Sequence, residues 1–297
     1  MKIAVFGQFY NEFTEISINK LFAVLEKKNN VKVYIERAFF SLIKQECSNT
    51  KVLEAFSVFE RLDRSFDFLI SIGGDGTILR AITHVKDLNI PIVGINTGRL
   101  GFLATIQLEN IENAIQDIIE GHYNISERTL LSVETTLEQE NITSFNFALN
   151  EVTVSRKNTT SMITVNTHLN GEYLTSYWSD GLIVSTPTGS TGYSLSCGGP
   201  VIMPNSSNVV LTPIASHNLN ARPLIIPDST SIELKVSGRE DYHLLSLDSR
   251  IMTLKNETPI FIKKADFKIR LISLKNEIFL DTLRKKLLWG ADTRNNK

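Results

Sequence analysis

The stretch Asp67-Phe-Leu-Ile-Ser-Ile72-Gly73-Gly74-Asp75-Gly76-Thr77 decides the fold class of this chain. Residues 67–72 form a short apolar run of the kind found in buried strands. After the glycines, residues 77–86 carry apolar side chains at helical spacing, namely Ile78, Leu79, Ile82 and Val85. A glycine-rich turn therefore joins a buried strand directly to a helix, which is the repeating unit of parallel α/β sheets.

The segments around this stretch repeat the alternation of strand and helix. The apolar pattern predicts strands over residues 3–6, 31–35 and 91–95, a helix over 12–29 and a partly helical segment over 37–59. This order predicts an α/β N-terminal domain whose parallel sheet carries helices on both faces.

After one more predicted helix at 108–120, the chain becomes rich in strands. Asn170-Gly171 separates two of them and predicts a type I′ hairpin, because both of its central positions favour φ > 0. We expect two domains: residues 1–103 with 276–297, and a β-rich C-terminal domain over 104–275. A final helix at 277–289 is expected to pack back on the first domain. The predicted strands of the second domain cover 129–135, 144–155, 162–169, 172–178, 182–185, 209–214, 231–236, 242–247, 259–262 and 268–273.

The composition excludes several classes of protein. Lys and Arg number 31 against 32 Asp and Glu, so the formal net charge is −1. No nucleic-acid partner is expected, since neutralising the phosphates of a duplex requires a basic surface. A small phosphorylated ligand needs only local donors and stays possible.

The cysteines and the apolar runs bear on the cellular compartment. Cys47 and Cys197 cannot form the disulfide framework of a small secreted protein. No apolar run approaches the ~20 residues of a membrane span, and the apolar stretch near Met1 is shorter than the roughly 7–15 residues of a signal-peptide core. We therefore expect a cytoplasmic protein with no membrane partner. No metal-ligand spacing is found among the histidines, which are His84, His122, His168, His217 and His243.

The Gly73–Thr77 turn is the first candidate site. Glycines let a ligand approach the backbone, and the N-terminus of the following helix offers unpaired N–H groups and a positive dipole that suit phosphate. Asp75 adds one carboxylate to this phosphate-binding backbone, a combination that phosphoryl transfer requires. Arg80, one turn into the helix, could reach a phosphate. The alternative interpretation is a tight turn in which Asp75 caps the helix.

A second candidate is the loop Thr186-Pro-Thr-Gly-Ser-Thr-Gly-Tyr-Ser-Leu-Ser-Cys-Gly-Gly-Pro200. Its hydroxyl groups and the aromatic face of Tyr193 suit ribose, adenine and carboxamide groups. No lysine follows its glycines, so it is not a Walker loop. The alternative interpretation is a surface loop rich in serine and threonine.

Three shorter motifs complete the candidate set. Asn150-Glu151 interrupts an apolar strand pattern, and such a polar pair must be hydrogen-bonded or bound to a ligand. Ser179-Asp180-Gly181 is either a plain turn or part of a site. Asn96-Thr-Gly-Arg-Leu-Gly-Phe102 follows a predicted parallel strand, so Asn96 and Phe102 should lie at the same sheet edge as Asp75.

Taken together and in order, these motifs resemble those of the NAD kinase family. The resemblance covers GGDGT at 73–77, NTGRLGF at 96–102, NEV at 150–152, SDG at 179–181, TPTGSTGYSLSCGGP at 186–200 and ARPLIIP at 221–227, with a tail that ends at Gly290. GGDG alone also occurs in phosphofructokinases and in lipid kinases, so the long 186–200 block is the specific element.

The resemblance implies a Rossmann-like or phosphofructokinase-like first domain and ATP-dependent phosphorylation of the adenosine ribose 2′-hydroxyl of NAD+, giving NADP+. Asp75 would accept the proton, with Gly76 in the phosphate-binding turn. Asn150 and Glu151 would hold the nucleoside parts, and Asp180 would contact the nicotinamide end. The adenine and ribose pocket would be lined by Thr191, Gly192, Tyr193, Ser194, Leu195 and Ser196, with Ala215 nearby.

Two departures from the family pattern concern the same site. Relatives often show Asp-Gly-Gln where this chain has Asp248-Ser249-Arg250, which leaves the role of Arg250 open. Trp178 stands where many members have a small or basic residue.

The resemblance further implies Mg²⁺ or another divalent cation bound with ATP, and a homo-oligomer, dimer or tetramer. Met162, Tyr173 and Tyr177 on the outer face of the predicted hairpin would offer a contact surface. Two alternatives stay open: a lipid kinase of the diacylglycerol or sphingosine type, and a non-catalytic dinucleotide-binding regulator.

Overall fold

The computed structural model describes residues 1–28, 30–46, 50–98, 100–136, 145–158, 161–275 and 279–289. Cys47, Arg99 and Gly290 lie outside the described residues, as do residues 276–278 and 291–297 of the predicted C-terminal segment. The chain forms two compact units, Met1–Glu127 with Ile269–Lys297, and Arg128–Lys268. In the described part of the chain, no helix is both long enough and apolar enough to span a bilayer.

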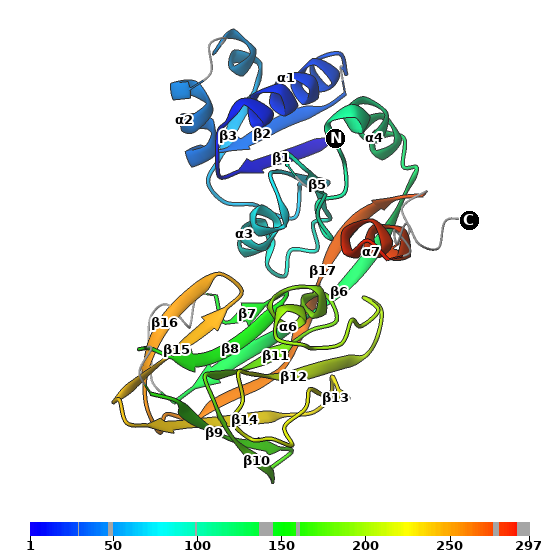
Figure 1. Ribbon diagram of the computed structural model, residues 1–297. Coiled ribbons are helices and arrows are strands. Elements are labelled where there is room, and N and C mark those ends of the chain that lie inside the picture. The colour runs from blue at the N-terminus through cyan, green and yellow to red at the C-terminus, as the bar shows by residue number, and fades with distance from the viewer. Residues whose placement is uncertain are drawn as a thin grey trace, which may run out of the picture. The chain divides into compact units, whose positions relative to one another are not determined.

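The first unit is built on a parallel sheet, as predicted. Its strand order is β5-β4-β1-β2-β3, and every neighbouring pair is parallel (Figure 1). The short strand β3 was not predicted, since its three residues lie at the end of the partly helical 37–59 segment. The strands are β1 (Lys2–Gly7), β2 (Lys32–Glu36), β3 (Ser57–Phe59), β4 (Phe68–Ile72) and β5 (Ile92–Ile95).

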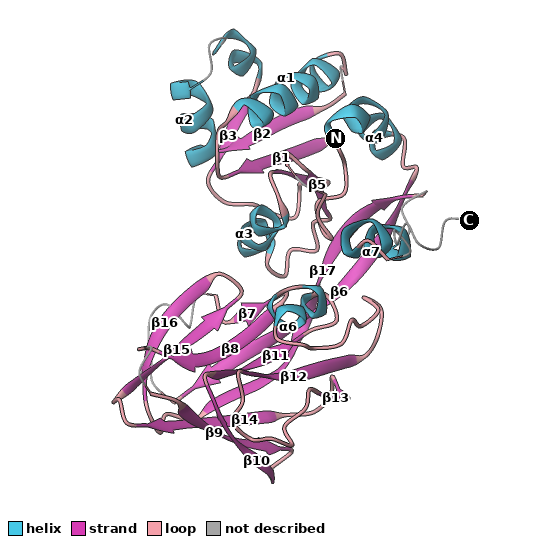
Figure 2. Ribbon diagram, in the orientation of Figure 1, coloured by secondary structure: helices cyan, strands magenta, loops and turns pink. Residues whose placement is uncertain are grey.

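Helices cover both faces of this sheet because side chains alternate along each strand. Ile3 and Val5 of β1 share a buried cluster with α1 and α4. On the other face of the sheet, Gly94 of β5 contacts Ile78 of α3. Figure 2 shows α3 on the opposite side of the sheet from α1. The helices are α1 (Glu12–Glu26), α2 (Arg37–Glu46), α3 (Asp75–Val85) and α4 (Ile111–Ile119), with 3-10 turns η1 (Thr50–Ala55) and η2 (Leu108–Asn110).

The C-terminal helix α7 (Phe279–Leu287) packs on the first unit, as expected from the sequence. Leu283 is buried, and the Phe279 ring lies 6.2 Å from that of Phe102, measured between centroids. The Lys286 ammonium lies 5.1 Å above the same Phe102 ring. The helix therefore supports the loop that follows β5.

The units divide the chain at positions other than the predicted domain boundaries at 103/104 and 275/276. Residues 104–127 and 269–275 group with the first unit. The physical reason is packing, because α4 lies against α1 and Leu271 in β17 (Ile260–Leu274) pairs in parallel with Ile92.

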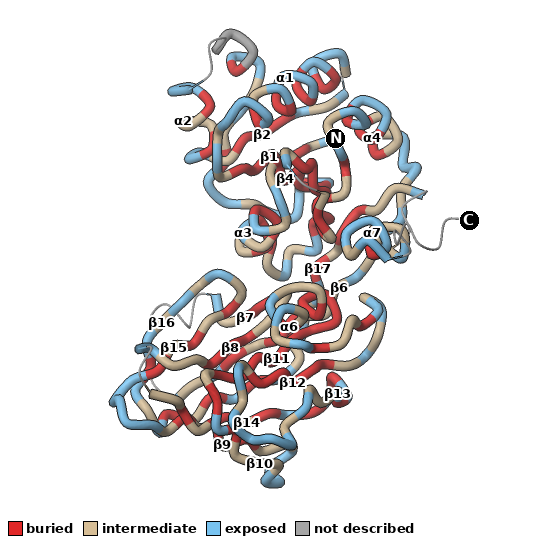
Figure 3. The backbone as a smooth tube through the Cα atoms, viewed as in Figure 1, coloured by how far each residue is buried: buried red, intermediate tan, exposed pale blue. Residues whose placement is uncertain are grey.

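The second unit is β-rich, as predicted, and consists of two antiparallel sheets around one core. One sheet has the order β13-β12-β11-β8-β15-β16, and the other contains β10-β9-β14-β17, with β6 paired to β17 and β7 paired to β6. Buried strands run through its interior (Figure 3). The strands are β6 (Tyr123–Thr135), β7 (Phe147–Ala148), β8 (Glu151–Arg156), β9 (Ile163–Leu169), β10 (Glu172–Ser179), β11 (Gly181–Ser185), β12 (Asn208–Ile214), β13 (Leu224–Pro227), β14 (Ile232–Gly238), β15 (Tyr242–Leu247) and β16 (Arg250–Lys255).

The hairpin between β9 and β10 confirms the Asn170-Gly171 prediction, since these residues have φ of 51° and 84°. Its predicted outer face was partly wrong. The register shifts between Tyr173 and Thr175, which reverses the alternation of faces along β10. Tyr177 is therefore buried, while Tyr173 and Trp178 are exposed.

Other differences from the predicted strands have simple causes. Residues 259–262 and 268–273 belong to the single strand β17, because the charged residues between them occupy the wet face of a half-buried strand. Strands β13 and β16 were not predicted, because the apolar run of β13 is short and ends in proline, and β16 mixes apolar with polar residues.

Candidate active site

The Gly73–Thr77 turn lies between β4 and α3, as predicted. Gly73 has a φ of 148°, and a Cβ there would overlap the Thr77 side chain, so the turn requires glycine. Gly74 occupies the N-cap position, and its backbone carbonyl starts the helix. Asp75 is therefore the first helical residue, and its carboxylate is free to bond elsewhere. The alternative interpretation of Asp75 as a helix cap is wrong.

The Asp75 carboxylate accepts three backbone N–H groups from the loop after β5. Oδ2 accepts from Phe102 at 2.8 Å, and Oδ1 accepts from Leu103 at 3.0 Å and from Ala104 at 2.9 Å. A carboxylate has about four lone-pair positions. Among the described residues these bonds leave one position on Oδ2 for a further donor. The predicted closeness of Phe102 and Asp75 is confirmed, but the contact is made by the backbone of Phe102.

Asn96 fixes the loop that holds Asp75. Its Nδ2 donates to the Ala104 carbonyl at 3.1 Å, and its Oδ1 accepts from the Gly98 N–H at 2.7 Å. The side chain is buried, so these bonds form in a low-dielectric environment where they are strong. Gly101 packs directly on Asp75, and a Cβ at this position would overlap the carboxylate.

Asn150 and Glu151 lie at the start of β8, beneath the loop at 189–196. A Cβ on Gly192 would lie 3.1 Å from Glu151 Oε2 and 3.5 Å from Asn150 Nδ2, so both side chains point at Gly192. The structure thus brings together two motifs that are about forty residues apart in sequence. Glu151 Oε2 is buried without a hydrogen-bond partner among the described residues.

Burial, and after it the neighbouring charge of Asp248, raise the pKa of Glu151 from 4.5 to about 8, against the opposing effect of the Tyr193 backbone N–H. Burial also raises the pKa of Asp248, but its three backbone N–H donors and Arg250 at 3.5 Å oppose this shift and favour the charged form. Of the two neighbouring acids, Glu151 is therefore the one that carries the proton near neutral pH.

Most hydroxyl groups of the 186–200 loop bond within the protein, so fewer of them are free to donate to a ligand than the loop sequence suggested. Thr186 Oγ1 donates to the Leu149 carbonyl at 2.6 Å, and Ser190 Oγ donates to that of Pro187 at 2.7 Å. Ser194 Oγ shares a hydrogen bond of 2.8 Å with Thr212 Oγ1. These buried hydroxyls fix the path of the loop.

The accessible part of this loop is narrower than the predicted set. Tyr193 and Ser196 are exposed, Thr191, Gly192 and Leu195 are half-buried, and Ser194 is buried. Burial and the neighbouring Cys197 raise the pKa of the Tyr193 hydroxyl. The accessible groups of the loop are thus the Tyr193 ring and its immediate neighbours.

Asp180 is paired with Arg156, a residue that the sequence analysis did not single out. Its Oδ2 lies 2.9 Å from Arg156 Nη2, and its backbone N–H bonds to the Ile214 carbonyl at 3.0 Å. The next residue after Ile214, Ala215, is exposed and has a φ of 44°. Asp180 and Ala215 are therefore neighbours at the end of the β11–β12 pair. Trp178 is exposed, and its ring lies 5.5 Å from that of His217.

Arg80 projects from α3 into a cavity of about 420 Å³ that it shares with Phe6, Gly7, Gln8 and His84. Asp75 does not line this cavity. Arg80 therefore lines a cavity that the Asp75 carboxylate does not share.

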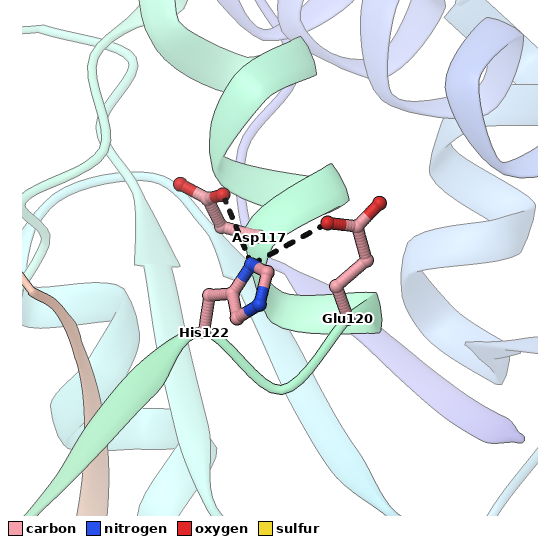
Figure 4. Close-up of side chains that lie close together, drawn as sticks. All are labelled: Asp117, Glu120 and His122. Carbon is pink, nitrogen blue, oxygen red and sulfur yellow. Dashed lines mark ion pairs between the residues drawn. The ribbon is translucent and has the colours of Figure 1, made fainter.

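The described residues contain one group that resembles a metal site, formed by Asp117, Glu120 and His122 (Figure 4). His122 Nδ1 lies 3.8 Å from Asp117 Oδ1 and 3.4 Å from Glu120 Oε2. Gly121, with φ of 78°, ends α4 and returns His122 to the Asp117 carbonyl. The helix end by itself brings these exposed side chains together, so we assign no ion to them.

Asp248 and Arg250 are the site residues that motif analysis missed or left open. Arg250 donates to the carbonyls of Phe145 and Phe147 and lies 5.3 Å from the Phe147 ring. The sequence signal for Asp248 was its position in a two-residue turn between strands, where an aspartate side chain can bond to a neighbouring backbone.

Two family models match the chain. The ATP-NAD kinase N-terminal domain matches residues 8–123, and the ATP-NAD kinase C-terminal domain matches residues 149–274. A NAD kinase of Flavobacterium psychrophilum is 59% identical over 295 residues, which is 99% of this chain and 100% of the relative. A NAD kinase of Cytophaga hutchinsonii is 45% identical over 297 residues, with the same coverage.

Solved structures give the same picture. Yeast NADH kinase complexed with NADH superposes with a TM-score of 0.85 at 23% identity, over 100% of this chain and 90% of that one, which shows the fold. A NAD kinase from Archaeoglobus fulgidus in complex with ATP gives a TM-score of 0.74 at 27% identity, over 97% and 99% of the two chains.

Proposed function

The chain belongs to the NAD kinase family and is an ATP-dependent NAD phosphotransferase, and we propose that Asp75 is its catalytic base. The observation that carries the assignment is the Asp75 carboxylate, which three backbone N–H groups hold in place while one lone-pair position on Oδ2 stays open. This position suits a hydroxyl donor, and the donor in this reaction is the 2′-hydroxyl of the adenosine ribose.

The proposed step transfers the γ-phosphoryl group of ATP to the ribose 2′-oxygen. The ribose 2′-oxygen forms a bond to the γ-phosphorus of ATP, the bond from that phosphorus to the β–γ bridging oxygen breaks, and ADP leaves. The hydroxyl proton passes to Asp75 Oδ2. Because phosphoryl transfer is loose, a weak base in a fixed position is sufficient, and positioning supplies most of the rate.

We assign the remaining predicted residues to binding of NAD+. Asn150 and Glu151 would contact the nucleoside parts, Asp180 the nicotinamide end, and the Thr191–Ser196 segment with Ala215 the adenine and ribose. The shared position of Asn150 and Glu151 beneath Gly192 supports this division. Ser194 would contribute by packing, since its hydroxyl bonds to Thr212.

Mg²⁺ is the proposed metal, and the described residues around Asp75 offer it few ligands. The open lone-pair position of Asp75 is assigned to the ribose hydroxyl, and the described residues around Asp75 form no carboxylate cage. This suits an ion that the ATP phosphates carry into the site. When bound, it neutralises charge on the transferred group.

Turnover of NAD+ and ATP to NADP+ is the decisive assay. The lipid-kinase alternative predicts phosphorylation of diacylglycerol or sphingosine instead, and the regulator alternative predicts binding of NAD+ without turnover. The relatives are NAD kinases, and no observation favours either alternative. Absence of NADP+ from a reaction of folded protein with both substrates and Mg²⁺ would overturn the proposal.

We also propose that the chain works as a homo-oligomer in the cytoplasm. Strand β10 lies at the edge of its sheet and exposes Tyr173 and Trp178, which favours self-association. Sedimentation over a dilution series, with activity measured in parallel, tests assembly. A fully active monomer near the chain mass of 33.4 kDa would overturn it.

A further inference from the structure

Asp248 forms a bonding pattern for which motif analysis gives no role. It lies in the turn between β15 and β16, and its side chain is 1% exposed. Oδ2 accepts the N–H of Leu149 at 3.0 Å, and Oδ1 accepts those of Asn150 at 2.7 Å and Glu151 at 3.2 Å. The Asp248 N–H in turn donates to the Glu151 carbonyl at 2.9 Å.

We propose that Asp248 is a positioning residue for NAD+, fixing the backbone of Leu149–Glu151 and with it the Asn150 and Glu151 side chains. The inference rests on the assignment of Asn150 and Glu151 to the nucleoside. Three consecutive N–H groups on one carboxylate leave the peptide little freedom, because each bond is charge-assisted.

Independent contacts hold the same peptide from its other side. The Asn150 carbonyl accepts the Thr186 N–H at 2.9 Å, and the Leu149 carbonyl accepts Thr186 Oγ1. Gly189 packs directly on Asn150, where a Cβ would overlap the backbone. The peptide is therefore fixed between the Asp248 carboxylate and the start of the 186–200 loop, and Asp248 supplies the only charged group among these described contacts.

Arg250 completes the arrangement. Besides pairing with Asp248, it donates to the Leu247 carbonyl at 3.2 Å and to the Phe145 carbonyl at 2.9 Å. The guanidinium thus ties the β15–β16 turn to the segment that precedes Leu149.

Electrostatics gives Asp248 a second effect on the same site. Its charge disfavours ionisation of Glu151, while Tyr193 is the other titratable side chain that approaches Glu151, from the 189–196 loop. Removing the Asp248 charge should therefore lower the pKa of Glu151. An unchanged titration would mean that Asp248 carries no charge beside Glu151.

The test compares Asp248→Asn with the matched control Asp228→Asn. Asp228 is another buried aspartate of the second unit, paired with Lys264 at 2.6 Å, and has no assigned role in binding. Calorimetry should show at least about tenfold weaker NAD+ binding for Asp248→Asn and less than about twofold change for Asp228→Asn. The KM for ATP should stay within about twofold, and the pH midpoint of the NAD+ KM should move to lower pH.

A second variant guards against misfolding. Asp248→Asn with Arg250→Gln removes both charges and leaves no unpaired buried ion, and the same loss of NAD+ affinity is expected. Equal loss of melting temperature in Asp248→Asn and Asp228→Asn, with NAD+ affinity and pH midpoint unchanged, would overturn the inference. Failure of both Asp248 variants to fold would also overturn it, since Asp248 would then be required for folding itself.

The test of the positioning role of Asp248 can succeed or fail independently of the proposed function. If the wild-type chain binds NAD+ but forms no NADP+, the function fails, while weaker NAD+ binding by Asp248→Asn would still support the positioning role.

Discussion

Asp75 and Asp248 use the same bonding pattern for opposite purposes. Each carboxylate accepts three N–H groups from consecutive residues, 102–104 for Asp75 and 149–151 for Asp248. Asp75 is half-buried and lies at an open glycine turn, whereas the Asp248 side chain is buried and paired with Arg250. Bound N–H groups thus do not distinguish the proposed catalytic base from a buried structural carboxylate, but access to the remaining lone pair does.

The largest expected effect comes from Asp75→Asn. The variant should lose about 10²–10⁴-fold in kcat, because an amide cannot accept the ribose proton. Its Nδ2 would also face a backbone N–H of the 102–104 loop, costing about 1–3 kcal/mol of unfolding free energy. Steady-state kinetics and thermal melting measure the two effects. A variant that keeps more than about a tenth of wild-type kcat would remove Asp75 as the base.

Gly101→Ala tests the geometry of Asp75 without changing a charge. The new Cβ would overlap the carboxylate, so the loop or Asp75 must move, and we expect kcat to fall about tenfold to a hundredfold. Gly98→Ala is the matched control, because its Cβ would meet only Asn96 Oδ1, at 4.0 Å. Equal kcat values for the two variants would show that the position of the Asp75 carboxylate is not limiting.

Glu151→Gln tests the acid that Asp248 influences. The variant should raise the KM for NAD+ more than that for ATP. The folded-state pKa of about 8 lies above the ordinary 4.5, so the folded protein keeps a proton that the unfolded chain has lost. The resulting stability is full below about pH 4.5 and falls as the pH rises towards 8, by up to about 1.4 kcal/mol per unit.

The glutamine variant should therefore show a flatter dependence of melting temperature on pH across this range, and it should gain stability relative to wild type towards pH 8. An unchanged pH dependence would mean that Glu151 is already ionised in the folded protein. Unchanged NAD+ kinetics would restrict the residue to a structural role.

Leu283→Ala tests whether α7, which supports the loop that bonds to Asp75, affects kcat as strongly as the position of the carboxylate does. Truncating this buried side chain should lower the unfolding free energy by about 2–5 kcal/mol, since α7 would pack less firmly. At temperatures where the variant stays folded, kcat should fall far less than in Gly101→Ala. A loss of kcat as large as that of Gly101→Ala would show that α7, through Phe102, determines the geometry of Asp75.

The smallest effect is expected from His122→Ala. This exposed histidine lies at the end of α4 beside two carboxylates, and its loss should cost less than about 1 kcal/mol, with kcat unchanged. The measurement adds the carboxylates of Asp117 and Glu120, which lie beside His122, to the comparison of Asp75 with Asp248. Loss of turnover, or a zinc-induced rise in melting temperature that disappears in the variant, would contradict the absence of an assigned ion.

Local sequence determined the elements of the first unit and several features of the second. Alternating apolar runs predicted its long strands and helices, since side-chain periodicity depends only on neighbouring residues. The same holds for the Asn170-Gly171 hairpin and for the glycine turn that presents Asp75. The motifs at 73–77 and 186–200 also identified the family, because their residue types meet close steric and bonding requirements.

Only the tertiary structure decided which polar side chains stay accessible to a ligand and which bond within the protein and shape the site. Asp75 meets the 102–104 backbone, and Asp248 meets 149–151, across separations of about 27 and 98 residues. Ser194 and Thr186 turned inward, and a register shift in β10 buried Tyr177. Such contacts depend on strand pairing and packing between distant segments, and no local periodicity records which partner a polar side chain will find.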